Sequence, residues 1–281
     1  MSVYATGVIA TELTWVPTYE TKAGGVRELP IPGHDLSGVV EEVGPGVTTL
    51  AKGSEVYALT AFDRDGAQAD YTIALPSELA PKPRTLTHVE AAAVPLSGLT
   101  AWQALFEHAH LVADQSVLIH GAAGGVGVFA VQLARWAGAH IIATASAHNR
   151  DFLRELGVNE IIDYTTTRFE DLVHNVDVVF DMVGRDTLER SWQVVKPGGV
   201  LVSVVSPRPS FAEAKSQHVR PVWFVVEPNR EQLIQIGSLI DAGKIRPIID
   251  TVLPLSQARQ AYEQGDGGHR RGKIVLRVVD G

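Results

Sequence analysis

The chain has 281 residues, of which 45% are hydrophobic and 20% charged, a balance typical of a soluble protein with one large or two ordinary domains. It contains no cysteine, which excludes disulfides, thiolate zinc sites, iron–sulfur clusters and a cysteine nucleophile. A net charge of −8 argues against binding to nucleic acids. No signal-peptide pattern is present, and no apolar stretch approaches about 18 residues, so we expect a cytoplasmic protein without a membrane span.

Residues 1–87 contain short β-branched segments bounded by Gly, Pro or charged residues, a pattern that predicts twisted strands. The predicted strands are 37–44, 55–59 and 69–75. Gly-Pro-Gly at 44–46 and Asp-Gly at 65–66 predict turns. We therefore expect a small, mostly β lobe in this part of the chain.

From residue 88 to 245, predicted helices alternate with short apolar strands, which favours a parallel sheet covered on both faces. The predicted strands are 116–120, 140–144, 160–163, 176–180, 200–205 and 222–226. The predicted helices are 88–93, 97–108, 124–137 and 149–156. A helix at 231–242, strands at 248–253 and 273–279, and a short helix at 256–264 follow, and we expect this tail to return to the first lobe. The sequence predicts an α/β fold: a Rossmann doubly wound domain at 88–245 and a smaller lobe from 1–87 and 246–281.

The clearest chemical signal is SVLIHGAAGGVGVFAVQLA, in which a buried strand runs into a glycine cluster that opens a helix. The spacing of Gly121, Gly124 and Gly127 is a variant of the GxGxxG motif. Glycine allows a tight turn and the close approach of a pyrophosphate, and the N–H groups at the helix start favour its charge. A second strand follows at the expected distance, so we interpret the motif as a dinucleotide site rather than a turn without a ligand.

The end of the second strand bears on the choice of coenzyme. NAD-binding domains usually carry Asp or Glu there for the ribose hydroxyls, whereas this chain has Thr144-Ala145-Ser146, followed by Arg150. A hydroxyl and a guanidinium can hold a 2′-phosphate. The sequence therefore favours NADP(H), with a solvated Arg150 as the alternative interpretation.

Several segments together resemble one known family. HGAAGGVGVFAVQLARWAGAHIIATAS (120–146) is similar to the nucleotide-binding turn of zinc-independent medium-chain dehydrogenases/reductases of the quinone oxidoreductase type. Four further segments resemble that family in its own order: PGHDLSGVVEEVG (32–44), AAAVPLSGLTAWQAL (91–105), VKPGGVLVSV (195–204) and RGKIVLRV (271–278).

The resemblance implies a GroES-like catalytic lobe beside the Rossmann lobe, with a substrate cleft between them. It implies NADP(H) as cofactor and a homodimer that forms through the sheet edge at 220–226. The positions that match cofactor-binding segments of the family are Thr100, Ala123, Gly124, Gly125, Val126, Ser146, Arg150, Tyr164, Val183, Val205, Ser206 and Lys273.

Two features depart from the family pattern. Family members begin with a β-hairpin before the motif that TGVIATELTW resembles, whereas this chain starts almost at that motif. We therefore expect a GroES-like lobe that lacks its leading strands, with an edge that is open or covered by a partner or a loop. The family motif Asn-Pro-x-Asp is replaced by Ile-Ala-Thr-Glu at 9–12, which removes an amide near the nicotinamide.

Catalytic candidates are weak in this sequence. Gly33-His34-Asp35 is similar to the GHE of zinc alcohol dehydrogenases, but without thiolates we expect no metal, and His34 is better explained as a packed residue near the cleft. Trp15 and Tyr19 match positions at the substrate mouth, where they would stack a flat ligand or pack the core. Glu12 is a candidate proton carrier or a solvated carboxylate.

We therefore predict an NADPH-dependent reductase that transfers hydride to a quinone or an α,β-unsaturated carbonyl substrate. The alternatives are an NADP-binding lyase or cyclase of a biosynthetic pathway, and a redox-silent cofactor-binding protein. A non-enzymatic interaction protein is a further alternative, because the surface is acidic and one lobe edge is expected to be uncovered.

Overall fold

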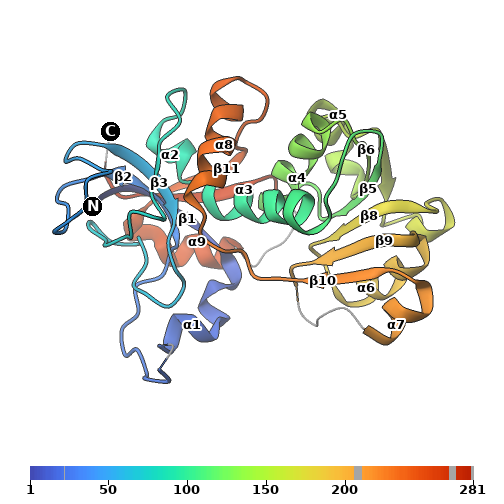
Figure 1. Cartoon of the computed structure of the whole chain (residues 1–281), viewed down its shortest axis with the longest axis horizontal. Coiled ribbons are helices and arrows are strands. Elements are labelled where there is room, and N and C mark those ends of the chain that lie inside the picture. Colours follow the sequence, from blue (N-terminus) through green and yellow to red (C-terminus); the bar gives the residue numbers. More distant parts are fainter. Residues whose placement is uncertain (22, 206–210, 266–269, 280–281) are drawn as a thin grey trace. The chain divides into compact units, whose positions relative to one another are not determined.

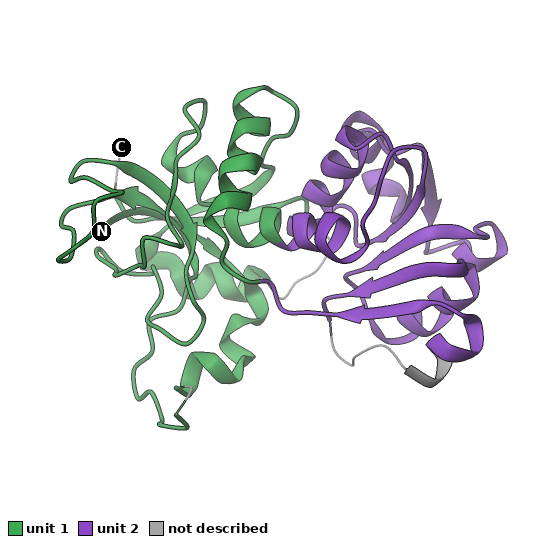
Figure 2. Ribbon diagram, viewed as in Figure 1, with its two compact units in different colours: residues 1–99, 227–281 green, residues 100–226 purple. Residues whose placement is uncertain are grey.

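The structure of the protein is a computed structural model that describes residues 1–21, 23–205, 211–265 and 270–279 (Figure 1). It divides into two compact units (Figure 2). Unit 1 comprises Met1–Leu99 and Glu227–Gly281, and unit 2 comprises Thr100–Val226. Within the described ranges, no helix has the length and apolar character needed to cross a membrane.

This division differs from the boundaries predicted after residue 87 and before residue 246. The helix α2 (His88–Ala91) packs on strands β1 (Ser2–Val8) and β2 (Asp35–Val39), and α8 (Arg230–Asp241) packs on the short strand β4 (Ala80–Pro81). Both helices therefore belong to unit 1 rather than to the parallel sheet.

Unit 1 is built on a six-stranded sheet with the order β11-β12-β1-β2-β3-β4. The strands not yet given are β3 (Glu55–Leu59), β11 (Ile249–Pro254) and β12 (Lys273–Arg277). Neighbouring strands are antiparallel except β11 and β12. Because β12 pairs with β1, the tail returns to the first lobe as predicted.

The prediction of a strand at 69–75 was wrong. Only Tyr71 in this segment forms a bridge, to Ser2, and the chain turns at Leu75–Glu78, where Glu78 N donates to Leu75 O. The strand β1, by contrast, was not predicted.

Short helices complete unit 1: η1 (Ala10–Thr14), α1 (Val16–Tyr19), η6 (Leu255–Gln257), α9 (Ala258–Gly265) and α3 (Pro95–Trp102), which crosses into unit 2. The helix α2 begins with a capping box, because the Thr87 side chain accepts from Glu90 N while the Glu90 side chain accepts from Thr87 N. The helix α9 packs on η1, and this contact brings Tyr262 to Glu12.

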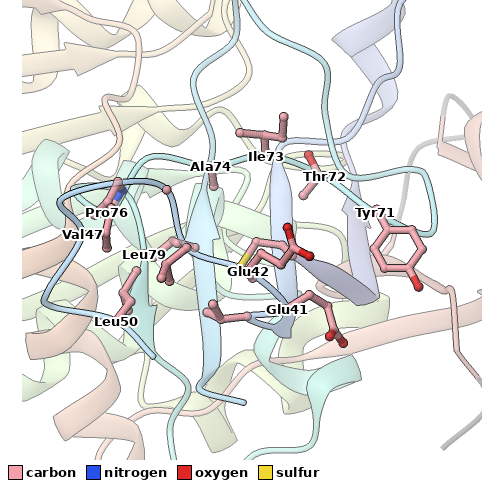
Figure 3. A pocket seen from close by; sticks show the side chains of 14 residues that line it. Glu41, Glu42, Val47, Leu50, Tyr71, Thr72, Ile73, Ala74, Pro76 and Leu79 are labelled. Atoms are coloured by element: carbon pink, nitrogen blue, oxygen red, sulfur yellow. The ribbon is translucent and has the colours of Figure 1, made fainter. Parts of the chain in front are cut away.

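Unit 1 also contains a pocket of about 720 Å³ between the segment that follows β2 and the segment around Tyr71 (Figure 3). Its lining is mostly apolar but includes the carboxylates of Glu41 and Glu42.

Unit 2 holds a six-stranded, fully parallel sheet with the order β10-β9-β8-β5-β6-β7. Its strands are β5 (Ser116–His120), β6 (His140–Ala145), β7 (Glu160–Asp163), β8 (Val176–Asp181), β9 (Val195–Ser203) and β10 (Arg220–Trp223). Counted from β5, this is the 3-2-1-4-5-6 order of the Rossmann fold, in which the order reverses between the first and fourth strands. The predicted doubly wound domain is therefore confirmed, and its reversal point lies between β5 and β8.

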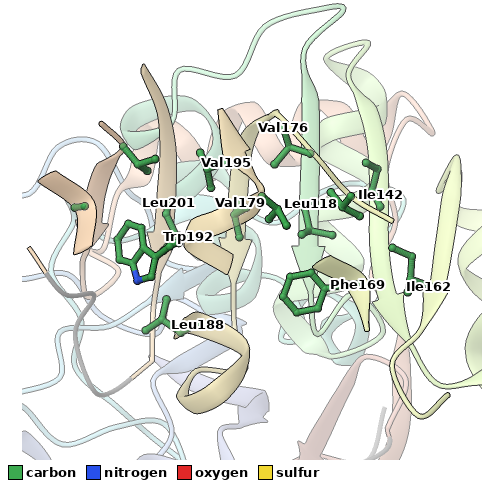
Figure 4. Packing of buried hydrophobic residues seen from close by; sticks show 14 residues of the cluster. Leu118, Ile142, Ile162, Phe169, Val176, Val179, Leu188, Trp192, Val195 and Leu201 are labelled. Atoms are coloured by element: carbon green, nitrogen blue, oxygen red, sulfur yellow. The ribbon is translucent and has the colours of Figure 1, made fainter. Parts of the chain in front are cut away.

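Helices connect these strands and cover the sheet (Figure 1). They are η2 (Gln103–His108, a π-helix), α4 (Gly125–Trp136), η3 (Ala147–Asn149), α5 (Arg150–Leu156), η4 (Phe169–Asp171), α6 (Arg185–Ser191), η5 (Trp192–Val194) and α7 (Phe211–Gln217). The helix α4 packs on β5 and β6, and α6 packs on β8 and β9. Alternate strand residues such as Leu118, Val179 and Leu201 bury one face of the sheet against Leu188 and Trp192 (Figure 4).

Candidate dinucleotide-binding site

The glycine-rich turn joins the end of β5 to the start of α4. Gly121 has a φ of +80°, which favours glycine, and its carbonyl accepts from Gly124 N at 3.1 Å. A Cβ on Gly127 would lie 2.2 Å from Gly121 O, so only glycine allows the helix to start this close to the turn. The sequence motif thus folds as predicted, with a glycine needed at both places.

The first turn of α4 is open to an anion. Gly124 precedes the helix with extended backbone, and no side chain caps it. The first helical hydrogen bond runs from Val128 N to Gly124 O, so the N–H groups of Gly125, Val126 and Gly127 are not used inside the helix. Three such donors at the positive end of a twelve-residue helix form a cradle suited to a phosphate.

The loop after β8 lies beside this turn. A Cβ on Gly121 would be 3.6 Å from Val183 Cγ2, and the Val183 side chain is half exposed. The buried Asp181 carboxylate fixes the loop by accepting from Val183 N and Gly184 N, each at 3.0 Å, and from Ser203 Oγ at 3.2 Å. Burial raises the pKa of Asp181.

Val205 follows β9 at the same edge of the sheet, because the carboxyl ends of parallel strands lie together. Its N–H lies 3.4 Å from Ser203 Oγ, and its carbonyl accepts from Trp223 Nε1 at 2.9 Å. The strand β9 ends at Ser203, two residues earlier than predicted. Ser206 lies outside the described residues.

The end of β6 carries the residues predicted to hold a third phosphate. Thr144 is buried, and its hydroxyl lies 2.9 Å from Nδ1 of the buried His120, whose Nε2 lies 3.1 Å from Ser191 Oγ. Burial lowers the pKa of His120 to about 3, so this histidine is a neutral bridge between β5, β6 and α6. Ser146 and Arg150 remain half-buried beyond the strand end.

A carboxylate on the next strand was missed by the sequence analysis. Asp163 ends β7 in register with Ala145, and its Oδ1 accepts from Thr165 N at 3.0 Å and from Thr165 Oγ1 at 2.7 Å. Those hydrogen bonds, together with the charge of Arg150, hold the pKa of Asp163 below its usual value. Tyr164 follows with its side chain half exposed. The sequence signal was the Asp-Tyr pair at the end of a predicted strand.

The remaining cofactor predictions fall in different surroundings. Ala123 is buried in the glycine-rich turn, and Thr100 is buried on α3. Lys273 is buried in unit 1, where its Nζ lies 2.9 Å from Asp35 Oδ2 and 3.3 Å from Val8 O. Its predicted role at the cofactor rests on resemblance alone.

The structure brings three of the four weak catalytic candidates into one aromatic and acidic cluster in unit 1. The His34 ring meets the Phe62 ring edge-on at 5.0 Å, and Trp15 meets the same ring at 5.3 Å. The His34 Nε2 lies 3.4 Å from Oε1 of the fully buried Glu12. Tyr19 is exposed at the end of α1.

Burial controls the protonation of this cluster. It raises the pKa of Glu12 to about 7, although Gly33 N donates to its Oε1 at 2.5 Å. It lowers the pKa of His34 to about 4, and Nδ1 of that ring lies 3.1 Å from Thr60 Oγ1. Tyr262, which the sequence analysis missed, donates to Glu12 Oε2 at 3.3 Å. Glu12 is therefore buried and hydrogen-bonded rather than solvated.

Zinc does not fit these side chains. The chain has no cysteine, and nowhere in the described part do three His, Asp or Glu side chains gather as metal ligands. The two nitrogens of His34 face Thr60 and Glu12.

Comparisons with known proteins agree with this architecture. Residues 1–84 match the family described as alcohol dehydrogenase GroES-like domain, and residues 156–276 match the family described as zinc-binding dehydrogenase. A protein of Arthroderma benhamiae named "Probable zinc-binding oxidoreductase, mitochondrial" is 37% identical over 99% of this chain and 87% of its own length.

Two further proteins carry more specific names. The chloroplastic NADPH-dependent alkenal/one oxidoreductase of Arabidopsis thaliana is 34% identical to this chain. The alignment covers 88% of this chain and 63% of that protein. The solved structure of the quinone oxidoreductase from Coxiella burnetii has a TM-score of 0.91 and 33% identity, covering 99% of this chain and 89% of that one. This chain therefore belongs to the medium-chain dehydrogenase/reductase family and is an NAD(P)H-dependent oxidoreductase.

Proposed function

We propose that this protein is an NADPH-dependent reductase of a quinone or of an α,β-unsaturated carbonyl compound. The observation that carries the proposal is the uncapped start of α4 at the point where the strand order of the parallel sheet reverses. The similarity to a quinone oxidoreductase and to an alkenal/one oxidoreductase supports the two substrate classes.

The choice of NADPH is supported by the end of β6. Positions 145 and 146 carry Ala and Ser rather than Asp or Glu, and Arg150 begins the α-helix that follows. Asp163 is the carboxylate that opposes this choice, but its Oδ1 is occupied by Thr165. We therefore assign the 2′-phosphate to Ser146 and Arg150, with Tyr164, which directly follows the neighbouring strand β7, as a further contact.

The chain's own groups account for binding and orientation. The N–H groups of Gly125 and Val126 would hold the diphosphate, and Val183 and Val205 would contact the nicotinamide part of the cofactor. When bound, NADPH supplies a hydride from C4 of its dihydronicotinamide. A quinone that accepts this hydride and one proton becomes a hydroquinone, and an enone becomes the saturated ketone.

The proton comes from water or from a side chain of unit 1. Glu12 is the candidate side chain, because its pKa of about 7 leaves it partly protonated at neutral pH and largely protonated below it. Trp15 supplies an aromatic surface for a flat substrate. No step in this scheme uses a metal, so we propose a zinc-independent enzyme.

The test is NADPH oxidation by the purified protein with a panel of quinones, alkenals and cyclic enones. Products of mass two hydrogens above the substrate, formed in equal amounts with NADP⁺, are the expected result. Tight NADPH binding without reduction of any acceptor in the panel would overturn the proposed activity.

We also propose that the enzyme is a cytoplasmic homodimer that binds neither nucleic acid nor membranes. The strand β10 is the outermost strand of its sheet and offers a pairing edge. Light scattering gives the mass in solution, and the mass of a dimer is the expected result. Fractionation of the source cells tests the location.

A further inference from the structure

One strand edge in unit 1 is unpaired. Val3 N donates to Asp70 O at 2.9 Å, and Thr72 N donates to Met1 O at 3.1 Å, so the pair formed by Ser2 and Tyr71 lies between these two bonds. In such an antiparallel pair, the N–H and C=O of Tyr71 point away from β1. Within the described part of the chain, neither group has a partner.

The open edge continues to Ile73. Alternation along the segment turns Ile73 N–H to the same outer side, and it too has no partner within the described ranges. The guanidinium of Arg64 donates to Ile73 O at 3.3 Å, which closes the edge at that carbonyl. Three consecutive backbone groups are thus free to pair with another strand.

The same segment exposes its apolar side chains. Tyr71 is 68% exposed and Ile73 is 77% exposed, whereas Thr72 between them is buried. An apolar, unpaired edge is a surface to which another polypeptide strand adds readily, unless charge or proline blocks it. Neither a lysine nor a proline stands at 71–75.

The pocket of about 720 Å³ lies against this edge, a volume within the range of binding pockets. Figure 3 shows Val47, Leu50, Pro76 and Leu79 gathered at one end of the pocket, and Tyr71 and Glu41 at the other. The apolar end can accept a side chain of a strand that pairs with the edge.

The carboxylates that line the pocket indicate which kind of ligand it binds. Glu41 lies 3.6 Å from Lys52 in a solvent-exposed ion pair, which neutralises it only in part. Glu42 is exposed, and no basic side chain pairs with it in the described part of the chain. A second copy of this chain in a symmetric contact would bring like carboxylates together, and the chain carries a net charge of −8. A small apolar molecule would leave the backbone edge unpaired.

We propose that the edge at Tyr71–Ile73 and the adjoining pocket bind an extended polypeptide segment in which apolar and basic residues alternate, added as a β-strand to unit 1. The free backbone groups hold the main chain, the apolar end of the pocket takes one side chain, and Glu42 and Glu41 pair with the basic residues. This site is separate from the dinucleotide site and does not depend on the reaction proposed above.

The test uses two synthetic six-residue peptides, one of alternating lysine and valine and one of alternating glutamate and valine, both with blocked ends. Calorimetric titration into the full-length protein is expected to show a Kd of roughly 10–100 μM for the lysine peptide and no binding for the glutamate peptide. Because the pairs are exposed, affinity for the lysine peptide should fall as salt is added.

Two variants locate the site. Glu42→Gln is expected to lower the affinity for the lysine peptide at least about fivefold. Glu28→Gln, a matched change of an exposed glutamate outside the pocket, is expected to leave that affinity unchanged. Ile73→Pro removes one edge donor without touching the bonds to β1 and is expected to abolish binding. Thermal melting and NADPH affinity of each variant show that the fold is retained.

Three results would overturn the proposal: no binding of the lysine peptide, equal binding of the glutamate peptide, or binding that survives Ile73→Pro in a folded protein. A wild-type dimer that becomes monomeric in Ile73→Pro would also overturn it, because the occupant would then be a second copy. Peptide binding without any reductase activity leaves this inference standing and refutes only the proposed reaction.

Discussion

At Gly127, α4 passes so close to the preceding turn that no side chain fits. The nearest atoms to an added Cβ are backbone atoms of Gly121 and Ala122, at 2.2–2.7 Å, and backbone cannot rotate away as a flexible side chain can. The position of the phosphate cradle thus depends on the absence of one methyl group.

Gly127→Ala is expected to displace the turn, to lower the affinity for NADPH at least about tenfold and to lower the free energy of unfolding by about 1–3 kcal/mol. Gly44→Ala is the matched control, because nothing lies within 4 Å of the Cβ it would add and its φ is not positive. Calorimetry and urea unfolding measure both effects. Equal NADPH affinity in the Gly127→Ala variant and the wild type would contradict the role of the turn.

Glu12 gives a second prediction at this scale. The unfolded chain ionises this carboxyl near its ordinary pKa, whereas burial raises the pKa to about 7 in the folded protein. Raising the pH from about 4.5 to 7 therefore ionises the unfolded state first and lowers the free energy of unfolding. Relative to Glu12→Gln, the wild type is expected to lose up to about 3 kcal/mol across this window.

Urea unfolding at both ends of the window measures this difference. His34, whose pKa is lowered to about 4, titrates in both proteins, so its contribution largely cancels. Glu28→Gln, which changes an exposed glutamate, is measured alongside as the matched control. If the difference in the free energy of unfolding between the wild type and Glu12→Gln did not change with pH, Glu12 would be ionised in the folded protein throughout this window.

At the scale of elements, α4 combines the proposed binding of the diphosphate with an uncapped first turn. Gly124 has a φ of −73° and a ψ of 176°, a conformation that suits Ser or Asp as the residue before a helix. The chain leaves this position without a side chain, so the first-turn donors stay available to a ligand. Helix stability and dinucleotide binding therefore compete for the same N–H groups.

Gly124→Asp is expected to stabilise the protein without cofactor by about 0.5 kcal/mol, because its carboxylate caps the helix. The same carboxylate repels a phosphate, so NADPH affinity is expected to fall more than about tenfold. Gly124→Ser, which adds a cap without charge, should lose less affinity. An Asp variant that keeps full NADPH affinity would show that the diphosphate binds elsewhere.

All six strands of unit 2 were predicted from the sequence, although β9 and β10 begin earlier than predicted and the helices α6 and α7 were not predicted. The strands at 116–120 and 160–163 were predicted with the bounds that the structure has, because buried parallel strands form short apolar runs between clear turn signals. Unit 1 was harder to predict. The segment at 69–75 alternates like a strand but pairs only at Tyr71, since long-range pairing rather than local pattern decides whether it joins a sheet.

In the candidate sites, too, local features were predictable from the sequence and long-range contacts were not. The glycine-rich turn was predictable because it is local, with its strand, glycines and helix contiguous in sequence. Asp163 and Tyr262 were missed because they reach the Ser146 and Glu12 regions only through folding. The burial of Glu12, His34 and Lys273 likewise follows from packing, which the identity of a charged residue does not reveal.

At the scale of the whole molecule, the chain combines a Rossmann unit with a second unit in which the carboxyl of Glu12 is buried. No zinc ligand set is present among the described side chains. We therefore propose that the reduction uses the organic cofactor without a metal.

Treatment with a strong chelator followed by gel filtration is expected to leave quinone or enone reduction unchanged, and added Zn²⁺ should not increase it. Metal analysis before and after treatment provides the control. Loss of activity on chelation, with recovery on addition of Zn²⁺, would show that a metal takes part.

The central claim is that the start of α4 binds a dinucleotide diphosphate and that Ser146 and Arg150 bind a third phosphate. Calorimetric titration of the wild type and of Arg150→Ala with NADPH and with NADH tests it most directly. We predict that the wild type prefers NADPH by about tenfold or more and that Arg150→Ala binds both coenzymes with similar, weaker affinity. Absence of heat with either coenzyme, or a preference for NADH in the wild type, would contradict the account.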